Sequence, residues 1–442
     1  MSIDNDKENV SNSSALDKQK CHVENHVQNL SNFEAMAHVV KGNVGIGILS
    51  LPFAFQYAGL IGGSLGLITI GLVCTYCGNL LLGASMECVK IRPDVQYLDY
   101  GTTAQTSFFE AGGYWKNWST TIKKLINSLV CANQIGFNAV SMVFMAENIR
   151  PIFIQCFGPT LEDYDYRLYI AIALPLILSF SFIRNMKYLI PFSAIANIIQ
   201  LGGVGILFGY FFFNKLNTVK ELLWFGQPNQ LALFFGMAIF SFDGVTVILP
   251  VQNCMKYPND MIGITGVLNK SMGFVTLLYT TFGFFGYLVY GEDIETTIVA
   301  NLSADELLTK LILGSYSMAI IFSYALRFYV IMEIIEEHCL DKESVWTERT
   351  QILTRIAVTL FTLALAASVP YLDLFVALIG SVTVSSLGIM CPCIIDTAVH
   401  WNDLGRLNWK ALKNGIIFSF GLLGCLAGAI DSSSRIIEKI LE

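Results

Sequence analysis

Charged residues are scarce in this 442-residue sequence, where Asp, Glu, Lys and Arg together make up 14%. Soluble domains are about a quarter charged, so this composition argues against a soluble protein. Catalytic signatures are also missing: there is no phosphate-binding loop, no Gly-x-Ser-x-Gly and no cluster of metal ligands. The eleven cysteines are scattered, and most fall in apolar segments, where a thiol usually packs as a small apolar group. We therefore expect no enzyme, metal, cofactor or nucleic-acid partner.

What the sequence does contain is long apolar runs, with a mean hydropathy of +0.57. Most runs are long enough for a helix to cross a hydrocarbon core of about 30 Å. Uninterrupted runs indicate helices rather than the alternating strands of a barrel. The sequence therefore predicts an all-α integral membrane protein in a lipid bilayer, with about eleven transmembrane helices. They cover roughly residues 36–58, 61–88, 123–146, 168–183, 188–213, 230–252, 262–290, 307–335, 350–369, 372–397 and 411–434.

The ends of the chain differ in character. Residues 1–33 are polar, without apolar periodicity, and predict a disordered tail in front of a transmembrane domain over 34–435. Of the Lys and Arg residues in the loops and at the segment ends, 17 fall on the side of the tail and seven on the opposite side. This excess predicts a cytoplasmic N-terminus and an extracellular or lumenal C-terminus. Asn301 heads an Asn-Leu-Ser sequon in an outer loop, which is a possible glycosylation site.

Two predicted helices carry matching interruptions. The first contains Gly42-Asn43-Val44-Gly45-Ile46-Gly47 and then a Leu-Pro at Pro52. The sixth contains Phe240-Ser241-Phe242-Asp243-Gly244 and then a Leu-Pro at Pro250. Because these breaks stand five segments apart, they predict two inverted five-helix repeats, each opening with a discontinuous helix. The repeats would span about 36–213 and 230–397, with one extra helix over 411–434.

A helix that unwinds at membrane depth needs partners for its free peptide groups, and a polar cavity supplies them. The N-terminus of a half-helix attracts a carboxylate, and free carbonyls attract an ammonium group, so the two breaks suit a zwitterion. The alternative is that these glycines only allow helices to pack closely. Because the second break carries an acid, we expect a substrate site. Its candidate residues are Gly42, Asn43, Gly45, Gly47, Phe240, Ser241, Phe242, Asp243 and Gly244.

The first break belongs to a series of segments that resembles a known family. Ala37–Pro52 resembles the first-helix signature of the proton-coupled amino acid transporters, within the amino acid/auxin permease group. Further similar segments follow in order over about 36–435. They are Phe182–Asn185, Phe235–Gly244, Tyr324–Val330, Leu372–Leu374 and Gly380–Val382. The resemblance implies the five-plus-five fold of sodium-coupled amino acid symporters with one extra helix. It also implies symport of small neutral amino acids with protons by alternating access.

Three ionisable side chains are candidates for coupling. The resemblance places His38 at a histidine that matters for proton coupling, and imidazole titrates near neutral pH. Asp243 lies in the second break, where it could take a proton, contact the substrate ammonium or pair with a cation. Arg327 is the candidate partner, and Ser323 shares its helical face. Arg327 forms either a permanent structural ion pair or a fixed charge in place of a coupling cation.

The sequence is also compatible with other functions. A membrane receptor that senses amino acids with little flux would use the polar tail to bind signalling partners. Sodium coupling and vesicular amino acid transport are further alternatives. The sequence leaves the membrane undecided between the plasma membrane and a lysosomal or endosomal one.

Overall fold

The structure is a computed structural model. It describes residues 30–91, 98–158, 164–184, 186–213, 222–302, 307–339, 348–368 and 371–441. Most of the predicted tail therefore lies outside the described residues. The first described helix begins at Asn32, two residues before the predicted start of the membrane domain, and the Ser31 side chain caps it.

Helices account for nearly all secondary structure in these ranges, apart from one isolated bridge between Leu30 and Met255. This confirms the all-α prediction. Short 3₁₀ turns lie in the connections, and two π-helical turns, Gly380–Val384 and Ser386–Met390, join α15 to α16. The helices are α2 (Asn32–Asn43), α3 (Gly47–Ala58), α4 (Leu60–Ile91), α5 (Tyr100–Ala111), α6 (Gly113–Lys116), α7 (Ser119–Phe157), α8 (Tyr166–Ser181), α9 (Met186–Phe213), α10 (Leu231–Ser241), α11 (Val245–Cys254), α12 (Val267–Tyr290), α13 (Leu307–Cys339), α14 (Glu348–Ser368), α15 (Leu372–Ile379), α16 (Cys391–Val399) and α17 (Trp409–Leu441).

All eleven predicted segments coincide with helices. Eight spans in the described residues are long and apolar enough to cross a membrane, and the bent pair α2 and α3 makes a ninth. The other two segments fall on α8 and on Ile198–Phe213 of α9, which are shorter apolar helices. The total of eleven crossings stays a prediction. Two helices, α5 and α6, lie between predicted segments.

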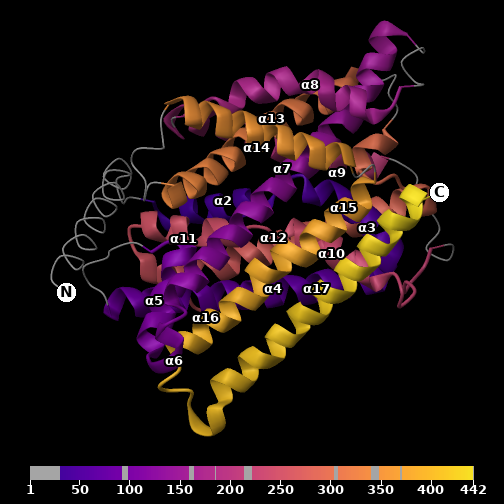
Figure 1. Ribbon diagram of the computed structural model, residues 1–442. Coiled ribbons are helices and arrows are strands. Elements are labelled where there is room, and N and C mark those ends of the chain that lie inside the picture. The colour runs from indigo at the N-terminus through magenta and orange to yellow at the C-terminus, as the bar shows by residue number, and fades with distance from the viewer. Residues whose placement is uncertain are drawn as a thin grey trace.

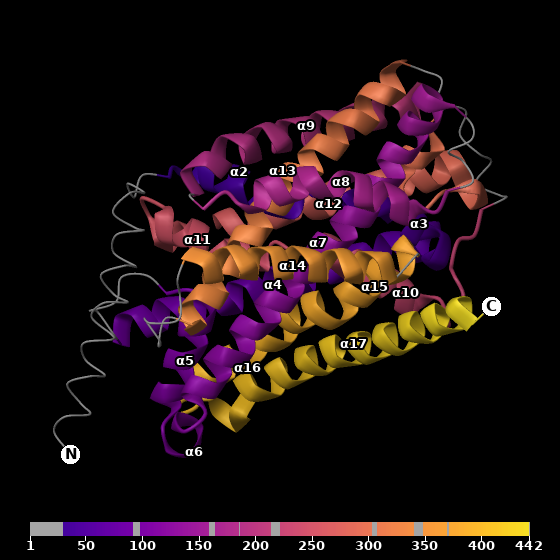
Figure 2. The ribbon, with the colours of Figure 1, turned by 45° about the horizontal axis from the view of Figure 1, so that its top comes forward.

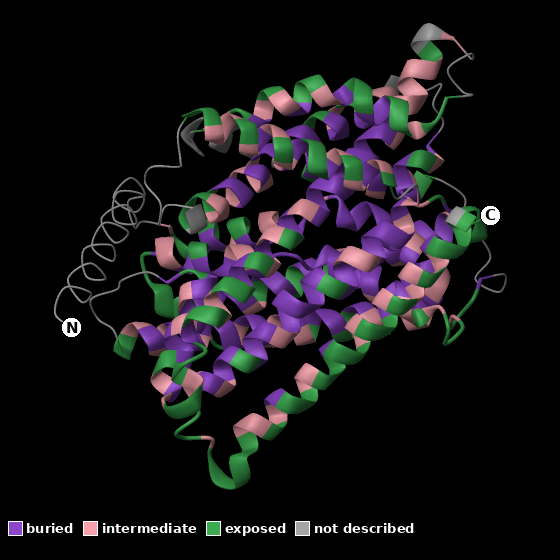
Figure 3. Ribbon diagram, in the orientation of Figure 1, coloured by how far each residue is buried: buried purple, intermediate pink, exposed green. Residues whose placement is uncertain are grey.

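The helices run in a broadly common direction and form one bundle (Figures 1 and 2). Buried residues concentrate in its middle, and exposed ones lie along the outer helices (Figure 3). The extra helix α17 lies along one side of the bundle, and only 17% of its apolar window is buried. Its exposed side chains include Leu422, Leu423, Leu426 and Ile430. Such a surface suits a lipid environment, because apolar groups there need no water.

The two interrupted spans lie against each other in opposite directions. A methyl group on Gly47, at the start of α3, would stand 2.8 Å from Ser241 Cα at the end of α10. A methyl group on Gly42, near the end of α2, would stand 3.2 Å from Val247 at the start of α11. At the far end of this pair, the Leu30 amide donates to the Cys254 carbonyl at 3.1 Å. The opposite directions are those that inverted repeats require.

The described chain begins and ends at opposite ends of the bundle. At the end of α3, the Tyr57 hydroxyl donates to Asp373 near the start of α15 at 3.2 Å. The last turns of α17 lie at this same end, where Lys439 Nζ stands 4.1 Å from the Tyr371 ring centroid. The start of α2 lies at the other end of the broken span. An odd number of crossings fits this arrangement.

Candidate functional site

Both predicted breaks are present. Val44, Gly45 and Ile46 separate α2 from α3, and the two half-helices meet at a bend of 57°. Phe242, Asp243 and Gly244 form a turn between α10 and α11. Together these two helices are still long and apolar enough to form one membrane span. The two breaks therefore differ in shape: the first redirects the chain, and the second interrupts it with a smaller bend.

The glycines in the breaks matter because they have no side chain and so allow the half-helices to approach closely. None of those in the breaks adopts a positive φ. A methyl group on Gly47 would meet both Cα and Oγ of Ser241 at 2.8 Å, whereas one on Gly45 would meet only the Asn43 carbonyl oxygen at 4.0 Å. Close approach between the breaks thus depends on Gly47. This geometry is compatible with both explanations of the glycines, close helix packing and a substrate site.

Asn43 connects the first break to the second. Its Nδ2 donates to the Val39 carbonyl in its own helix at 2.9 Å. Its Oδ1 accepts the Gly244 amide of the other break at 3.2 Å. Asn43 is buried, with 5% of its surface exposed. One side chain therefore satisfies a free peptide group that the second interruption leaves behind.

Tyr279 of α12 joins the carboxyl ends of two half-helices. Its hydroxyl lies 2.6 Å from the carbonyl of Asn43, the last residue of α2, and 2.9 Å from that of Ser241, the last residue of α10. Both carbonyls carry the partial negative charge of a helix C-terminus, and one hydroxyl proton serves both. The tyrosine is fully buried, and its ring packs edge-on against Phe242 at 5.1 Å. Sequence reasoning missed this residue.

Asp243 forms an ion pair with Arg327, its candidate partner, in which the aspartate is buried and the arginine half-buried. Arg327 Nη1 lies 2.9 Å from Asp243 Oδ2, and the Asp243 side chain is 6% exposed. The other oxygen, Oδ1, accepts from Asn133 Nδ2 at 2.7 Å. Arg327 Nη1 also donates to Gln134 Oε1 at 3.1 Å, and Thr383 donates to Asn133 Oδ1 at 2.6 Å. Four elements, α7, the second break, α13 and the first π turn, supply this cluster.

Aromatic rings complete the cluster on one side. Phe137 of α7 stacks on Phe240, with centroids 4.0 Å apart and planes at 8°. The Arg327 guanidinium lies 4.2 Å from the Phe137 centroid, within the range of a cation–π contact. The predicted residue Phe240 therefore lies beside the ion pair, with 1% of its surface exposed.

Two predicted residues stand apart from these contacts. His38 is exposed on α2, in the same stretch as Glu34 and Lys41. Among the described residues no hydrogen bond or ion pair joins His38 to the Asp243 cluster. Ser323 is half-buried one turn before Arg327. The structure thus unites the two breaks with Arg327 and leaves the histidine on the surface of the first half-helix.

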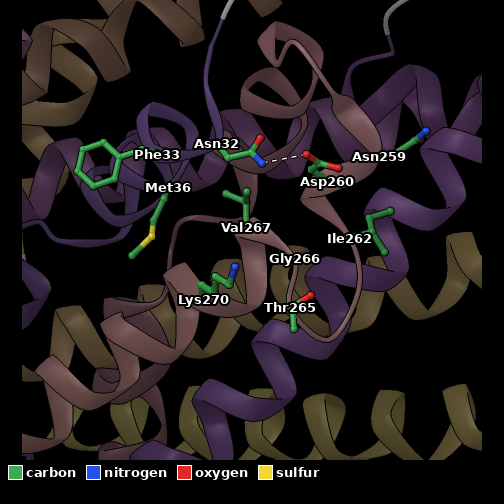
Figure 4. A pocket seen from close by; sticks show the side chains of 10 residues that line it. All are labelled: Asn32, Phe33, Met36, Asn259, Asp260, Ile262, Thr265, Gly266, Val267 and Lys270. Carbon is green, nitrogen blue, oxygen red and sulfur yellow. Dashed lines mark hydrogen bonds between the residues drawn. The ribbon is translucent and has the colours of Figure 1, made fainter.

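A cavity of about 380 Å³ lies at the beginning of α2 (Figure 4). Asn32 borders it and donates to Asp260 at 2.8 Å, which links α2 to the connection after α11. Lys270 and Met36 also line it. Met36 is the last α2 residue to do so, about two turns before Asn43. This cavity is therefore separate from the paired breaks.

The side chain of Asn301 is engaged in the loop that carries it. Its Nδ2 donates to the Asp293 carbonyl at 3.0 Å, and its Oδ1 accepts the Glu295 amide at 2.9 Å. The sequon serine, Ser303, lies outside the described residues. Glycosylation here stays a prediction.

Comparison with known proteins identifies the family of this chain. The sequence model of the family described as "Transmembrane amino acid transporter protein" matches residues 28–434. The chain belongs to this family. It is therefore a multi-pass integral membrane transporter of amino acids, and not an enzyme.

Two relatives illustrate the likeness. The proton-coupled amino acid transporter-like protein pathetic of Drosophila melanogaster is 30% identical over 410 residues, which cover 92% of this chain and 85% of the relative. The amino acid transporter AVT3C of Arabidopsis thaliana is 27% identical over 421 residues and 92% of each chain. Both matches extend over nearly the whole transporter, including the two breaks and Arg327.

Proposed function

We propose that this transporter carries small neutral amino acids together with protons by alternating access. The observation that supports the proposal is the meeting of the four half-helix ends at the two breaks, next to the ion pair of Asp243 and Arg327. Such ends offer both polarities of the peptide dipole at one place. The name of the Drosophila relative is consistent with proton coupling.

The substrate carboxylate would bind at the start of α3. Ile46, the N-cap residue there, has no side-chain hydrogen bond that caps the helix, so the first-turn amides can receive an anion. The ammonium group would bind the carbonyls of Asn43 and Ser241, which the Tyr279 hydroxyl now contacts. The close approach of Gly47 to Ser241 favours a small substrate side chain.

Proton transfer would use His38. Both oxygens of Asp243 already accept a hydrogen bond, one from Arg327 and one from Asn133, so adding a proton would break one of these bonds. His38 is exposed, and no hydrogen bond joins its side chain to another described residue. We therefore assign the fixed countercharge to Asp243 and the moving proton to His38.

Transport into proteoliposomes tests the function. The purified protein is given labelled glycine, alanine and proline while pH and sodium gradients are imposed separately. We expect uptake of all three under the pH gradient and no response to sodium. Uptake that follows sodium alone would replace the proposal with a sodium symporter. Saturable binding without flux would indicate a receptor, and obligatory counter-exchange a vesicular exchanger.

A matched pair of histidine variants tests the proton path. In His38→Ala, substrate should no longer acidify the vesicle lumen, because the proton-carrying group is gone. We expect uptake driven by the pH gradient to fall more than tenfold, measured with a pH-sensitive dye and labelled alanine. His400→Gln, at the end of α16, is the control and should transport normally. Full acidification by His38→Ala would rule out His38 as the proton carrier.

A further inference from the structure

Four cations gather at the end of the bundle where the described chain begins, the tail-side end. The last turns of α17 lie at the opposite end, so the first turn of this long helix lies here. The short helix α6 lies beside the connection between α16 and α17 in both views (Figures 1 and 2), and Trp115 packs edge-on against Trp401 with ring centroids 5.1 Å apart. The cations of these elements, which form the basic patch, are Lys116, Arg406, Lys410 and Lys413.

The basic patch carries an excess of positive charge. Among the described residues, only Lys410 of the patch has a carboxylate within 4 Å, with its Nζ 3.9 Å from Asp403 Oδ2. Arg406 is exposed. Lys413 Nζ lies 5.1 Å from the centroid of the Tyr76 ring on α4, a contact that orients the ammonium group but does not neutralise it. A surface of this kind attracts an anionic partner.

The turn before α17 exposes an apolar side chain. Leu407 and Asn408 both have a positive φ, 58° and 53°, a backbone conformation that a bulky residue such as leucine rarely adopts. Leu407 is 93% exposed. Water would stabilise neither feature, whereas the acyl chain of a lipid would remove this side chain from water. The basic patch therefore fits a lipid better than a soluble anion.

Exposed aromatic residues lie beside the basic patch. Trp409, Tyr114 and Trp118 are 60%, 68% and 47% exposed, and such residues are enriched where a membrane meets water. Their depth agrees with this. The helix α7 begins directly after Trp118 and extends about 21 Å before it reaches Asn133, which contacts the second break. With the breaks at mid-bilayer, that length exceeds the half-thickness of the hydrocarbon core, about 15 Å, and places the patch among the headgroups.

We propose that the basic patch binds anionic phospholipids of the tail-side leaflet. Their headgroup oxygens neutralise Lys116, Arg406 and Lys413, and their acyl chains lie against Leu407 and Trp409. Zwitterionic phospholipids offer the same phosphate but carry a cation of their own, so the patch selects lipids with a net negative charge. The bound lipids hold the connection between α16 and α17 at the membrane surface, away from the substrate site at the breaks.

Lipid retention by the full-length protein tests the proposal. The protein in detergent micelles is given equal amounts of phosphatidylserine and phosphatidylcholine with identical acyl chains, and the lipids that remain after size-exclusion chromatography are quantified by mass spectrometry. We expect phosphatidylserine to be retained at least tenfold more, and this preference to disappear at about 1 M salt, where charges on the surface are screened. Equal retention of the two lipids at low salt would overturn the proposal, and this result needs no variant.

Charge variants locate the site. The double variant Arg406→Gln with Lys413→Gln should lower the preference for phosphatidylserine about fivefold for each cation removed. Lys256→Gln with Lys270→Gln is the matched control, because it removes the same charge at the same end of the bundle but outside the patch. It should keep the preference. An equal loss in both double variants would show that selection follows the total charge of this end, which would also overturn the proposal.

The turn at Leu407 separates a lipid from a soluble anion. Leu407→Asn removes the apolar side chain and keeps the left-handed turn, which Asn tolerates. We expect it to retain less than half as much phosphatidylserine as the wild-type protein. Displacement of phosphatidylserine by millimolar inorganic phosphate, with full retention by Leu407→Asn, would show a site for phosphate in general and contradict the lipid proposal. None of these measurements depends on transport, so they are distinguishable from failure of the proposed function.

Discussion

At the scale of single residues, the Asp243–Arg327 pair is the most demanding feature of the transporter. Removing two charges from water costs more than a simple contact returns unless hydrogen bonds complete the site. Here Asn133 and Gln134 supply them, one to each member of the pair. The folded state should therefore lose more stability when one charge of the pair is removed than when both are removed.

We expect Asp243→Asn to lower the free energy of unfolding by about 3–5 kcal/mol, because it leaves Arg327 as an uncompensated cation. The double variant Asp243→Asn with Arg327→Gln should recover part of this loss. Denaturant unfolding in detergent measures both. A double variant less stable than either single variant would contradict the ion-pair account.

If Arg327 also takes the place of a coupling cation, uptake by Arg327→Gln should become sodium-sensitive.

The Tyr279 hydroxyl, which contacts both breaks, can be tested by a single substitution. Tyr279→Phe removes one hydroxyl and leaves the carbonyls of Asn43 and Ser241 without their shared donor. We expect about 1–3 kcal/mol of lost stability, since two buried acceptors lose their partner. The affinity for the amino acid substrate should change as well, because the hydroxyl no longer occupies the proposed ammonium site. Unchanged substrate affinity, measured by scintillation proximity, would remove Tyr279 from the site.

At the scale of secondary-structure elements, the paired breaks depend on how closely α3 approaches α10. Gly47→Ala would place a methyl group 2.8 Å from Ser241 Cα, a backbone atom that cannot turn aside. We expect uptake to fall at least tenfold, because the breaks must move apart. Gly83→Ala on α4 is the control, since a methyl group there meets nothing within 4 Å. Equal uptake by both variants would show that the close approach is dispensable.

At the scale of the whole molecule, the two ends of the described chain lie at opposite ends of the bundle. With the excess of Lys and Arg on the side of the tail, this predicts a cytoplasmic N-terminus and a lumenal or extracellular C-terminus. Protease treatment of sealed microsomes should remove an N-terminal epitope tag and spare a C-terminal one. Removal of both tags would indicate an even number of crossings.

The sequence located the helices and the breaks well but could not find most of the surrounding site. Asp243 and Arg327 were predictable partners, because an embedded charge needs an opposite one. Asn133, Gln134, Tyr279 and Thr383 gave no comparable signal. Each is one polar residue within an apolar segment, and its role depends on which face of that segment turns inward. His38, in contrast, was assigned to proton coupling by resemblance, and the structure leaves it outside the cluster.

The sequence by itself determined that this chain is helical, crosses a membrane repeatedly and is interrupted twice. Those properties follow from local hydropathy and from Gly and Pro within apolar runs, which need no distant partner. Tertiary structure alone decided that Asn43 satisfies the Gly244 amide and that the Tyr279 hydroxyl donates to the last carbonyls of two half-helices. These contacts join residues up to 236 positions apart, because buried peptide groups take whatever partner the packing brings within reach.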